Sequence, residues 1–149
     1  MSGGLENPIE LLLVEDNPGD ARLTQDAFEQ LSMETTIHVA TDGTDALEFL
    51  STRHDHETES VPDLILLDLN LPRMGGLEFL EAIRDDSSFA SLPVLVVTSS
   101  TATEDILESY ELAANAYLIK PTDPDEYAAM VDAIAAFWFR HAALPPITS

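Results

Sequence analysis

Residues 63–76 read Asp-Leu-Ile-Leu-Leu-Asp-Leu-Asn-Leu-Pro-Arg-Met-Gly-Gly, and this segment decides the fold class of the chain. Its run Leu64–Asp68 is apolar on both faces, which is typical of a strand in the middle of a parallel sheet. A turn rich in proline and glycine follows, and apolar residues from Leu77 to Ile83 then recur with the period of an amphipathic helix. The segment therefore predicts a buried strand that is followed directly by a helix.

The same order of strand and helix extends from this segment in both directions. The predicted strands are Ile9–Val14, Thr36–Ala40, Leu64–Asp68, Pro93–Thr98 and Ala116–Lys120. The predicted helices are one with Pro18 in its first turn, a short one over Thr44–Leu50, one from Leu77, one from Thr101 and one from Asp123 to about Phe139. Five such units predict an α/β fold: a doubly wound parallel sheet with helices on both faces and right-handed connections.

Local signals add detail to two of the connections. Thr101-Ala-Thr-Glu104 has the pattern of a capping box at the start of the fourth helix. Asp123 is the predicted N-cap of the fifth helix, with Pro124 in its first turn. Residues 51–62 are polar and show no periodicity, so we predict an enlarged surface loop there.

The C-terminal helix ends in an aromatic run. Tyr127 and Phe137 are expected in the core, whereas Trp138 or Phe139 could either pack against the same domain or seal a dimer. The predicted division of the chain is an N-terminal tail over 1–8, one domain over 9–140 and a C-terminal tail over 141–149.

The composition narrows the functions that the chain could have. Its 149 residues suffice for one domain with a substantial core, and 45% of them are hydrophobic. The absence of cysteine excludes disulfides and thiolate chemistry. The apolar runs are too short to cross a bilayer and the N-terminus lacks the pattern of a signal peptide, so we expect a cytoplasmic protein without membrane insertion.

Acidic residues dominate the charge of the chain: 28 Asp and Glu stand against 6 Lys and Arg, a net charge of −22. A surface of this kind repels nucleic acid, which argues against a DNA-binding function. The acids are spread between apolar segments rather than collected in a tail. Such a distribution suits a protein kept soluble in high salt, where self-repulsion is screened, and we therefore predict a halophilic source.

Polar residues that could carry chemistry stand at the carboxyl ends of the predicted strands. They are Glu15 and Asp16 after the first strand, Asp68 at the end of the third, Thr98 of the fourth and Lys120 of the fifth. Ligands of doubly wound sheets bind outside these strand ends. Carboxylates can bind a hard cation such as Mg²⁺, and one of them can act as a nucleophile. Because a hydroxyl and an ammonium can hold phosphoryl oxygens, the pattern predicts a phosphoryl-transfer site.

Each of these residues also has a plainer interpretation. Lys120 is the only lysine of the chain, and its ammonium could form an ion pair with Asp16 or Asp68 without any chemistry. Glu15 and Asp16, taken alone, are more simply a solvated pair that caps a helix. Asp68 is harder to explain in this way, because carboxylates are rarely placed at the end of a fully apolar strand without a partner.

Three segments together resemble the receiver domains of two-component response regulators. They are Leu-Leu-Val-Glu-Asp-Asn at 12–17, the decisive segment at 63–76 and Tyr-Leu-Ile-Lys-Pro at 117–121. The resemblance, to the chemotaxis response regulator and its relatives, covers roughly Ile9 to Phe139. It implies a flavodoxin-like, five-stranded sheet with strand order 2-1-3-4-5. The enlarged loop makes the chain similar to the single-domain, phytochrome-associated response regulators.

The resemblance assigns roles to the strand-end residues. It implies that Asp68 is the phosphoacceptor and that Mg²⁺ is bound by Asp16, Asp68 and the backbone carbonyl of Asn70, with Glu15 contributing through a metal-bound water. Lys120 would hold the phosphoryl group. Five residues match the family's motif in the same order along the chain. A plain ion pair between Lys120 and an aspartate is therefore not a sufficient explanation of the pattern.

The resemblance also implies a switch. Thr98 would bind the phosphoryl oxygen and move toward it, and Tyr117 would turn inward behind Thr98. Asn70 and Ser100 occupy the positions that tune the rate of dephosphorylation in the family. Pro121 matches a proline whose preceding peptide bond is usually cis.

The function implied is that of a stand-alone receiver. A sensor histidine kinase or phosphotransfer protein would donate a phosphoryl group from phosphohistidine, and bound water would later hydrolyse the product slowly, so the chain would not be a turnover enzyme. Only about ten residues follow the last predicted helix, so we expect signalling through contact with an unknown downstream protein or through a homodimer built on the C-terminal helix region.

Three other classes of protein could be considered for the same residues. A haloacid-dehalogenase-type phosphatase needs a second aspartate two residues after Asp68, where Asn70 stands. A flavodoxin-like electron carrier would need a phosphate-binding loop after the first strand, which is absent. The serious alternative is a phosphorylation-independent, receiver-like binding module.

Overall fold

The sheet of the protein consists of five parallel strands in the order β2-β1-β3-β4-β5. The computed structural model describes residues 9–55 and 61–139, and the predicted tails lie outside these ranges. The strands are β1 (Ile9–Val14), β2 (Thr35–Ala40), β3 (Leu64–Leu67), β4 (Val94–Thr98) and β5 (Ala116–Ile119). The helices are α1 (Pro18–Glu29), α2 (Gly43–Asp55), α3 (Gly76–Asp85), α4 (Thr103–Glu111) and α5 (Pro124–Ile134), followed by a π-helical turn over Ala135–Phe139. The predicted fold class and strand order are confirmed.

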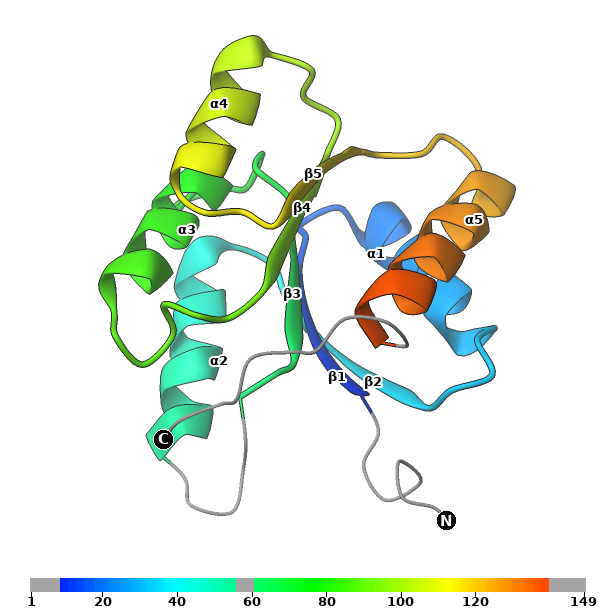
Figure 1. The fold of residues 1–149 in the computed structure, drawn as a ribbon, viewed down its shortest axis with the longest axis horizontal. Helices are drawn as coiled ribbons and strands as arrows, with labels where there is room; N and C mark the ends of the chain where they lie inside the picture. The colour runs from blue at the N-terminus through cyan, green and yellow to red at the C-terminus, as the bar shows by residue number, and fades with distance from the viewer. Residues whose placement is uncertain (1–8, 56–60, 140–149) are drawn as a thin grey trace.

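The helices cover both faces of the sheet (Figure 1), with α1 and α5 on one side and α2, α3 and α4 on the other. Strand β3 explains this arrangement. Ile65 and Leu67 point into the core beneath α2 and α3, whereas Leu64 and Leu66 point into the core beneath α1 and α5. All four side chains are buried, which is why the strand is apolar at every position.

Two of the predicted helix starts are confirmed. Asn17 caps α1 by accepting a hydrogen bond from the backbone N–H of Asp20 at 3.0 Å, and Pro18 follows in the first turn. Asp123 caps α5 by accepting from the backbone N–H of Glu126 at 2.8 Å. Both caps fix the first turn of a helix whose N-terminus lies at the carboxyl end of the sheet.

The capping box predicted at Thr101 is wrong. Helix α4 begins at Thr103, and no side chain caps it. Ser100 is the residue that organises this turn, because its hydroxyl accepts from the backbone N–H of Ala102 at 3.2 Å and donates to Asp105. Ser100, one residue before Thr101, therefore makes the side-chain hydrogen bonds at this turn that were expected of Thr101.

The polar segment after Leu50 is not a loop from its first residue, as predicted, because α2 continues to Asp55. Tertiary contacts stabilise this extension. The Arg53 guanidinium lies 3.2 Å from the Glu10 carboxylate and 4.9 Å above the Phe49 ring. These contacts outweigh the weak apolar periodicity of the segment, and the remainder of the predicted loop, over 56–60, lies outside the described residues.

The aromatic end of the chain differs from the prediction at one position. Tyr127 is buried as predicted, but the Phe137 side chain is 57% exposed, and Trp138 packs against the core in its place. A π-helical turn is wider than an α-helical turn, so it changes which residues face inward. The side chain of Phe139 lies outside what the structure describes.

Arg84, near the end of α3, joins three segments of the fold. Its guanidinium donates to four backbone carbonyls, those of Ala90, Leu92, Leu112 and Ala113, at 2.9–3.1 Å. These carbonyls belong to the approach to β4 and to the end of α4. Arg84 therefore holds one end of α4 against α3.

Replacing Arg84 with alanine is expected to lower the free energy of unfolding by about 2–4 kcal/mol, because four backbone carbonyls, two of them in partly buried bonds, lose a charged donor. Equilibrium urea unfolding at constant salt measures the change. Arg22→Ala is the matched control, since its exposed pair with Asp26 contributes only about 0.3–0.5 kcal/mol. Equal losses in the two variants would contradict the role given to Arg84.

Candidate functional site

The predicted strand-end residues converge at the carboxyl edge of the sheet. They border a solvent-open depression of about 460 Å³ lined by Glu15, Asp16, Asn17, Pro18, Asp20, Asp68, Asn70, Ser99 and Lys120. The order of the strands explains the convergence, because β1 and β5 lie on either side of β3 and β4 and all four end at the same edge.

Three of the acids form a cluster that suits a metal ion. Oxygen atoms of Glu15, Asp16 and Asp68 all lie within 4.8 Å of one another. Glu15 and Asp68 are buried, whereas Asp16 is exposed, so a cation could keep part of its water shell. Asn70 lies beside the cluster, since its backbone N–H donates to Asp68 Oδ1 at 3.1 Å. The all-oxygen donor set fits a hard divalent cation.

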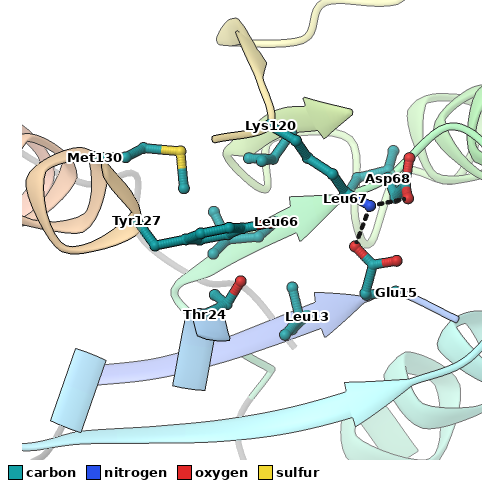
Figure 2. A pocket seen from close by; sticks show the side chains of 10 residues that line it. Leu13, Glu15, Thr24, Leu66, Leu67, Asp68, Lys120, Tyr127 and Met130 are labelled. Carbon is teal, nitrogen blue, oxygen red and sulfur yellow. Dashed lines mark hydrogen bonds and ion pairs between the residues drawn. The ribbon is translucent and has the colours of Figure 1, made fainter. Parts of the chain in front are cut away.

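Lys120 is the centre of an ion-pair network. Its Nζ lies 2.9 Å from Glu15 Oε1, 2.8 Å from Asp68 Oδ2 and 2.8 Å from Asp20 Oδ2. Figure 2 shows the ammonium between Glu15 and Asp68. Burial opposes the charged form of Lys120, but the three carboxylates outweigh it and raise the pKa of this side chain. Of the two partners considered from the sequence, Asp68 pairs with Lys120 and Asp16 does not within the described chain.

Asp20 is the member of the network that sequence reasoning missed. It occupies the first turn of α1, three residues after the N-cap Asn17. An acid at this position is common as a helix-capping feature, so its sequence signal alone does not distinguish a cap from a partner of Lys120. The structure shows that its carboxylate faces the ammonium across the site.

The Asp68 carboxylate is held in its ionised form. Burial alone would raise its pKa, but hydrogen bonds from Lys120, the Asn70 backbone and Thr98 together outweigh burial and keep the pKa below its usual value. An ionised carboxylate at the floor of an open depression can act as a nucleophile toward a group that enters from solvent.

Thr98 and Tyr117 lie on adjacent strands near the site. Thr98 is fully buried at the end of β4, and its backbone carbonyl accepts from the Lys120 N–H at 2.9 Å. Tyr117 is half-buried, and its hydroxyl donates to the Ser100 carbonyl at 2.9 Å. The predicted switch pair and Ser100 are therefore connected through the short segment that follows β4.

The peptide bond before Pro121 is trans in the structure, contrary to the expectation from the family resemblance. The trans form of a bond before proline is the intrinsically favoured one, by about 0.5–1 kcal/mol. Lys120 reaches all three carboxylates with the bond in this form.

Glu15 titrates in an unusual range. Burial raises its pKa to about 7 from 4.5, and the Asp68 charge adds to the effect, whereas Lys120 and the Asn17 N–H oppose it. Between these two pH values the folded protein binds more protons than the unfolded chain. In the absence of a divalent cation, we therefore expect the free energy of unfolding to fall by up to about 1.4 kcal/mol for each pH unit from about 4.5 to 7.

Urea unfolding in the presence of a chelator, at several pH values in this range, measures that slope. Glu15→Gln should flatten it, and an added divalent cation should flatten it too, because a bound cation favours the ionised carboxylate. Asp68 does not contribute, since its lowered pKa confines its effect to pH values below 3.8. Asp63, whose pKa is raised by burial at the far end of β3, supplies a residual slope in the variant. An unchanged slope in Glu15→Gln would disprove the assignment.

A family model described as the response regulator receiver domain matches residues 11–132. The chain belongs to this family. Receiver domains take part in two-component signalling and are not turnover enzymes. The resemblance stated from the three sequence segments is thereby confirmed, and the match runs from within β1 to near the end of α5.

Two relatives of this receiver are of similar length. Response regulator Rcp1 from Synechocystis sp. is 37% identical over 97% of this chain and 99% of its own. FilR2, described as a probable methanogenesis regulatory protein of Methanothrix harundinacea, is 38% identical over 89% of this chain and 85% of its own.

Solved structures agree with this assignment. The crystal structure of the Mn²⁺-bound form of Rcp1 matches with a TM-score of 0.83 at 37% identity, covering 93% of this chain and 100% of the other. The phosphorylated cyanobacterial phytochrome response regulator RcpA matches with a TM-score of 0.86 at 36% identity, covering 94% and 100%. Within residues 9–55 and 61–139, the receiver has no helix of the length and hydropathy needed to cross a membrane.

Proposed function

We propose that this receiver is a stand-alone phosphorylation switch whose acceptor is Asp68. The observation that carries the proposal is the convergence of an ionised aspartate, a cation-binding acid cluster and one lysine in an open depression. A relative of the same length, crystallised with Mn²⁺, and another crystallised in the phosphorylated state support it.

The Asp68 carboxylate attacks the phosphorus atom of a phosphohistidine presented by a sensor histidine kinase or phosphotransfer protein. A phosphorus–oxygen bond to Asp68 forms as the phosphorus–nitrogen bond to histidine breaks, and the imidazole leaves with a proton. Lys120 already lies 2.8 Å from Asp68, so its ammonium can follow the phosphoryl oxygens as charge collects on them. The Thr98 hydroxyl supplies a second donor from β4.

The acid cluster would hold Mg²⁺, with Asp16, Asp68 and the Asn70 carbonyl as the residues that bind it, and Glu15 would contribute through water. A cation bound there would neutralise charge between the carboxylates and the incoming phosphate. Glu15 and Asp68 are buried and fixed, whereas Asp16 is exposed to solvent, so the cation can enter from the open side.

The signal leaves the site through Thr98 and Tyr117. When Thr98 turns to the phosphoryl group, the contact between Tyr117 and the Ser100 carbonyl rearranges, and the face formed by α4 and β5 changes shape. Hydrolysis by water ends the signal, at a rate tuned by the side chains of Asn70 and Ser100. We propose that the recipient is a downstream protein and that the switch operates in the cytoplasm.

A homodimer through the C-terminal helix region is a second partner hypothesis. The exposed Phe137 borders an apolar groove of about 370 Å³ between β5 and α5. Sedimentation of the wild type and of Phe137→Ser would test it, with a monomer in both cases counting against the dimer.

Intact-mass measurement tests the proposed function. The protein is incubated in high salt with Mg²⁺ and a small phosphodonor such as acetyl phosphate. We expect the gain of one phosphoryl group, labile to hydroxylamine as an acyl phosphate is. A folded, Mg²⁺-bound protein without mass gain would favour the alternative, a receiver-like module that binds partners independently of phosphorylation.

A further inference from the structure

The hydroxyl of Tyr127 is a buried polar group without a use in the scheme above. The side chain is 1% exposed, and in the described part of the chain its hydroxyl makes no hydrogen bond of standard geometry. A buried hydroxyl without a partner is unfavourable and therefore calls for an explanation. Core packing alone would be served equally well by phenylalanine.

The Tyr127 ring extends from α5 toward the ion-pair network of Lys120 (Figure 2). It borders a cavity of about 10 Å³ together with Glu15, Thr24 and Lys120, which is about the smallest volume that holds one water molecule. Burial raises the pKa of Tyr127 to about 12, and Asp20 adds to the increase through its negative charge and through a contact with the hydroxyl that is outside standard hydrogen-bond geometry. The hydroxyl thus lies within the electrostatic reach of the Asp20 carboxylate.

Asp20 is fixed in place by its own helix. Its backbone N–H donates to Asn17 Oδ1 at 3.0 Å, and its backbone carbonyl accepts from the Thr24 hydroxyl at 3.0 Å. Its carboxylate, 2.8 Å from Lys120 Nζ, is neither part of the metal cluster nor the phosphoacceptor. Asp20 is also more exposed than the other two partners of Lys120, with 30% of its side chain accessible.

The three hydrogen atoms of the Lys120 ammonium are matched by three carboxylates in the resting protein. A phosphoryl group on Asp68 adds oxygens that need this same cation. We propose that Asp20 is a positioning residue for Lys120, and that the Tyr127 hydroxyl becomes the donor to Asp20 when Lys120 turns to the phosphoryl group. The proposal rests on the phosphorylation of Asp68 and links the site to α1 and α5, on the face of the sheet opposite α4.

The signal of [¹³Cζ]tyrosine tests the new hydrogen bond directly. The chain has three tyrosines, Tyr110, Tyr117 and Tyr127, so single phenylalanine variants assign each signal. We expect the Tyr127 signal to shift when intact mass shows phosphate on Asp68, and to stay unshifted on phosphorylation in Asp20→Ala. Phosphate on Asp68 without a shift overturns this proposal alone. Absence of phosphate overturns the proposed function and this proposal together.

Tyr127→Phe should act oppositely on the two states. The resting variant should keep or gain resistance to urea, because it loses only an unpartnered hydroxyl. The lifetime of the phosphorylated variant should be about three- to tenfold shorter than that of the phosphorylated wild type, which corresponds to the loss of one hydrogen bond. A purely structural tyrosine would destabilise the resting protein or leave both states unchanged, and either result counts against the proposal.

Asp20→Ala should slow phosphorylation by the small donor about threefold or more, because Lys120 loses a fixed contact beside Asp68. The rate for Asp20→Asn should lie between those of the wild type and Asp20→Ala, because its amide oxygen can still accept a hydrogen bond from Lys120. Asp26→Ala is the matched control: it removes the same charge from α1 but contacts Arg22 instead of Lys120. Equal or faster phosphorylation of Asp20→Ala would overturn the positioning role.

Discussion

Asp68→Asn is expected to abolish phosphoryl uptake and to leave the protein folded. The amide that replaces the carboxylate has no anionic oxygen to attack phosphorus. The fold survives, because Lys120 keeps Glu15 and Asp20 as partners and the Asn70 N–H can still donate to the amide oxygen. Loss of one charged ligand from a cluster of three should also weaken Mg²⁺ binding by about tenfold or more.

Intact mass after incubation with a phosphodonor measures the first effect, and calorimetric titration with Mg²⁺ the second. Asp63→Asn is the matched control, because Asp63 lies just before β3, at the end opposite Asp68. Its carboxylate accepts from the Glu10 N–H at 2.9 Å, a bond that the asparagine oxygen can keep. If the Asp68→Asn variant still gains a phosphoryl group, the acceptor must be another residue.

Most of this site follows from the sequence because the edge of a parallel sheet collects distant residues. Asp68 and Lys120 are 52 positions apart, yet each follows an apolar run. Those two runs become β3 and β5, which flank β4 in the parallel sheet and end at the same edge. The same reasoning places Glu15 and Thr98. It depends on recognising the strands, which the apolar pattern predicted, and on their order, which the family resemblance implied; both are confirmed.

The features that the sequence could not supply depend on side-chain contacts across elements. Asp20 looks like any acid in a first helical turn until β5 brings Lys120 beside it. Arg53 extends α2 through its contact with Glu10, and Phe137 turns outward because of a single π-helical turn. None of these contacts has a periodicity or a motif of its own, so only the three-dimensional arrangement reveals them.

The stability of this receiver is expected to depend strongly on salt. Its net charge is −22, and the basic side chains that the structure describes already have partners: Arg22, Arg53 and Arg73 pair with acids, Arg84 donates to carbonyls and Lys120 joins three carboxylates. Most of the acids within residues 9–55 and 61–139 therefore pair with no Lys or Arg. Helices α1, α4 and α5 have no basic residue in their last turns, where a cation would be favourable.

Salt screens this repulsion, since the Debye length falls from about 10 Å at 0.1 M to about 3 Å at 1 M. We expect the free energy of unfolding to rise by on the order of 3 kcal/mol or more between 0.1 and 2 M KCl, with sucrose at equal osmolality giving a smaller gain.

Charge reversal separates screening from general effects of salt on burial. Glu29 and Glu111 are the last residues of α1 and α4, where a negative charge opposes the helix dipole. Glu29→Lys together with Glu111→Lys should raise stability at 0.1 M KCl and reduce its dependence on salt, because the variant carries four fewer units of negative charge and completes both helix ends. A wild-type protein that is fully stable in dilute buffer, with no gain from KCl, would reject the halophilic interpretation and require that the acids be stabilised by contacts within the fold.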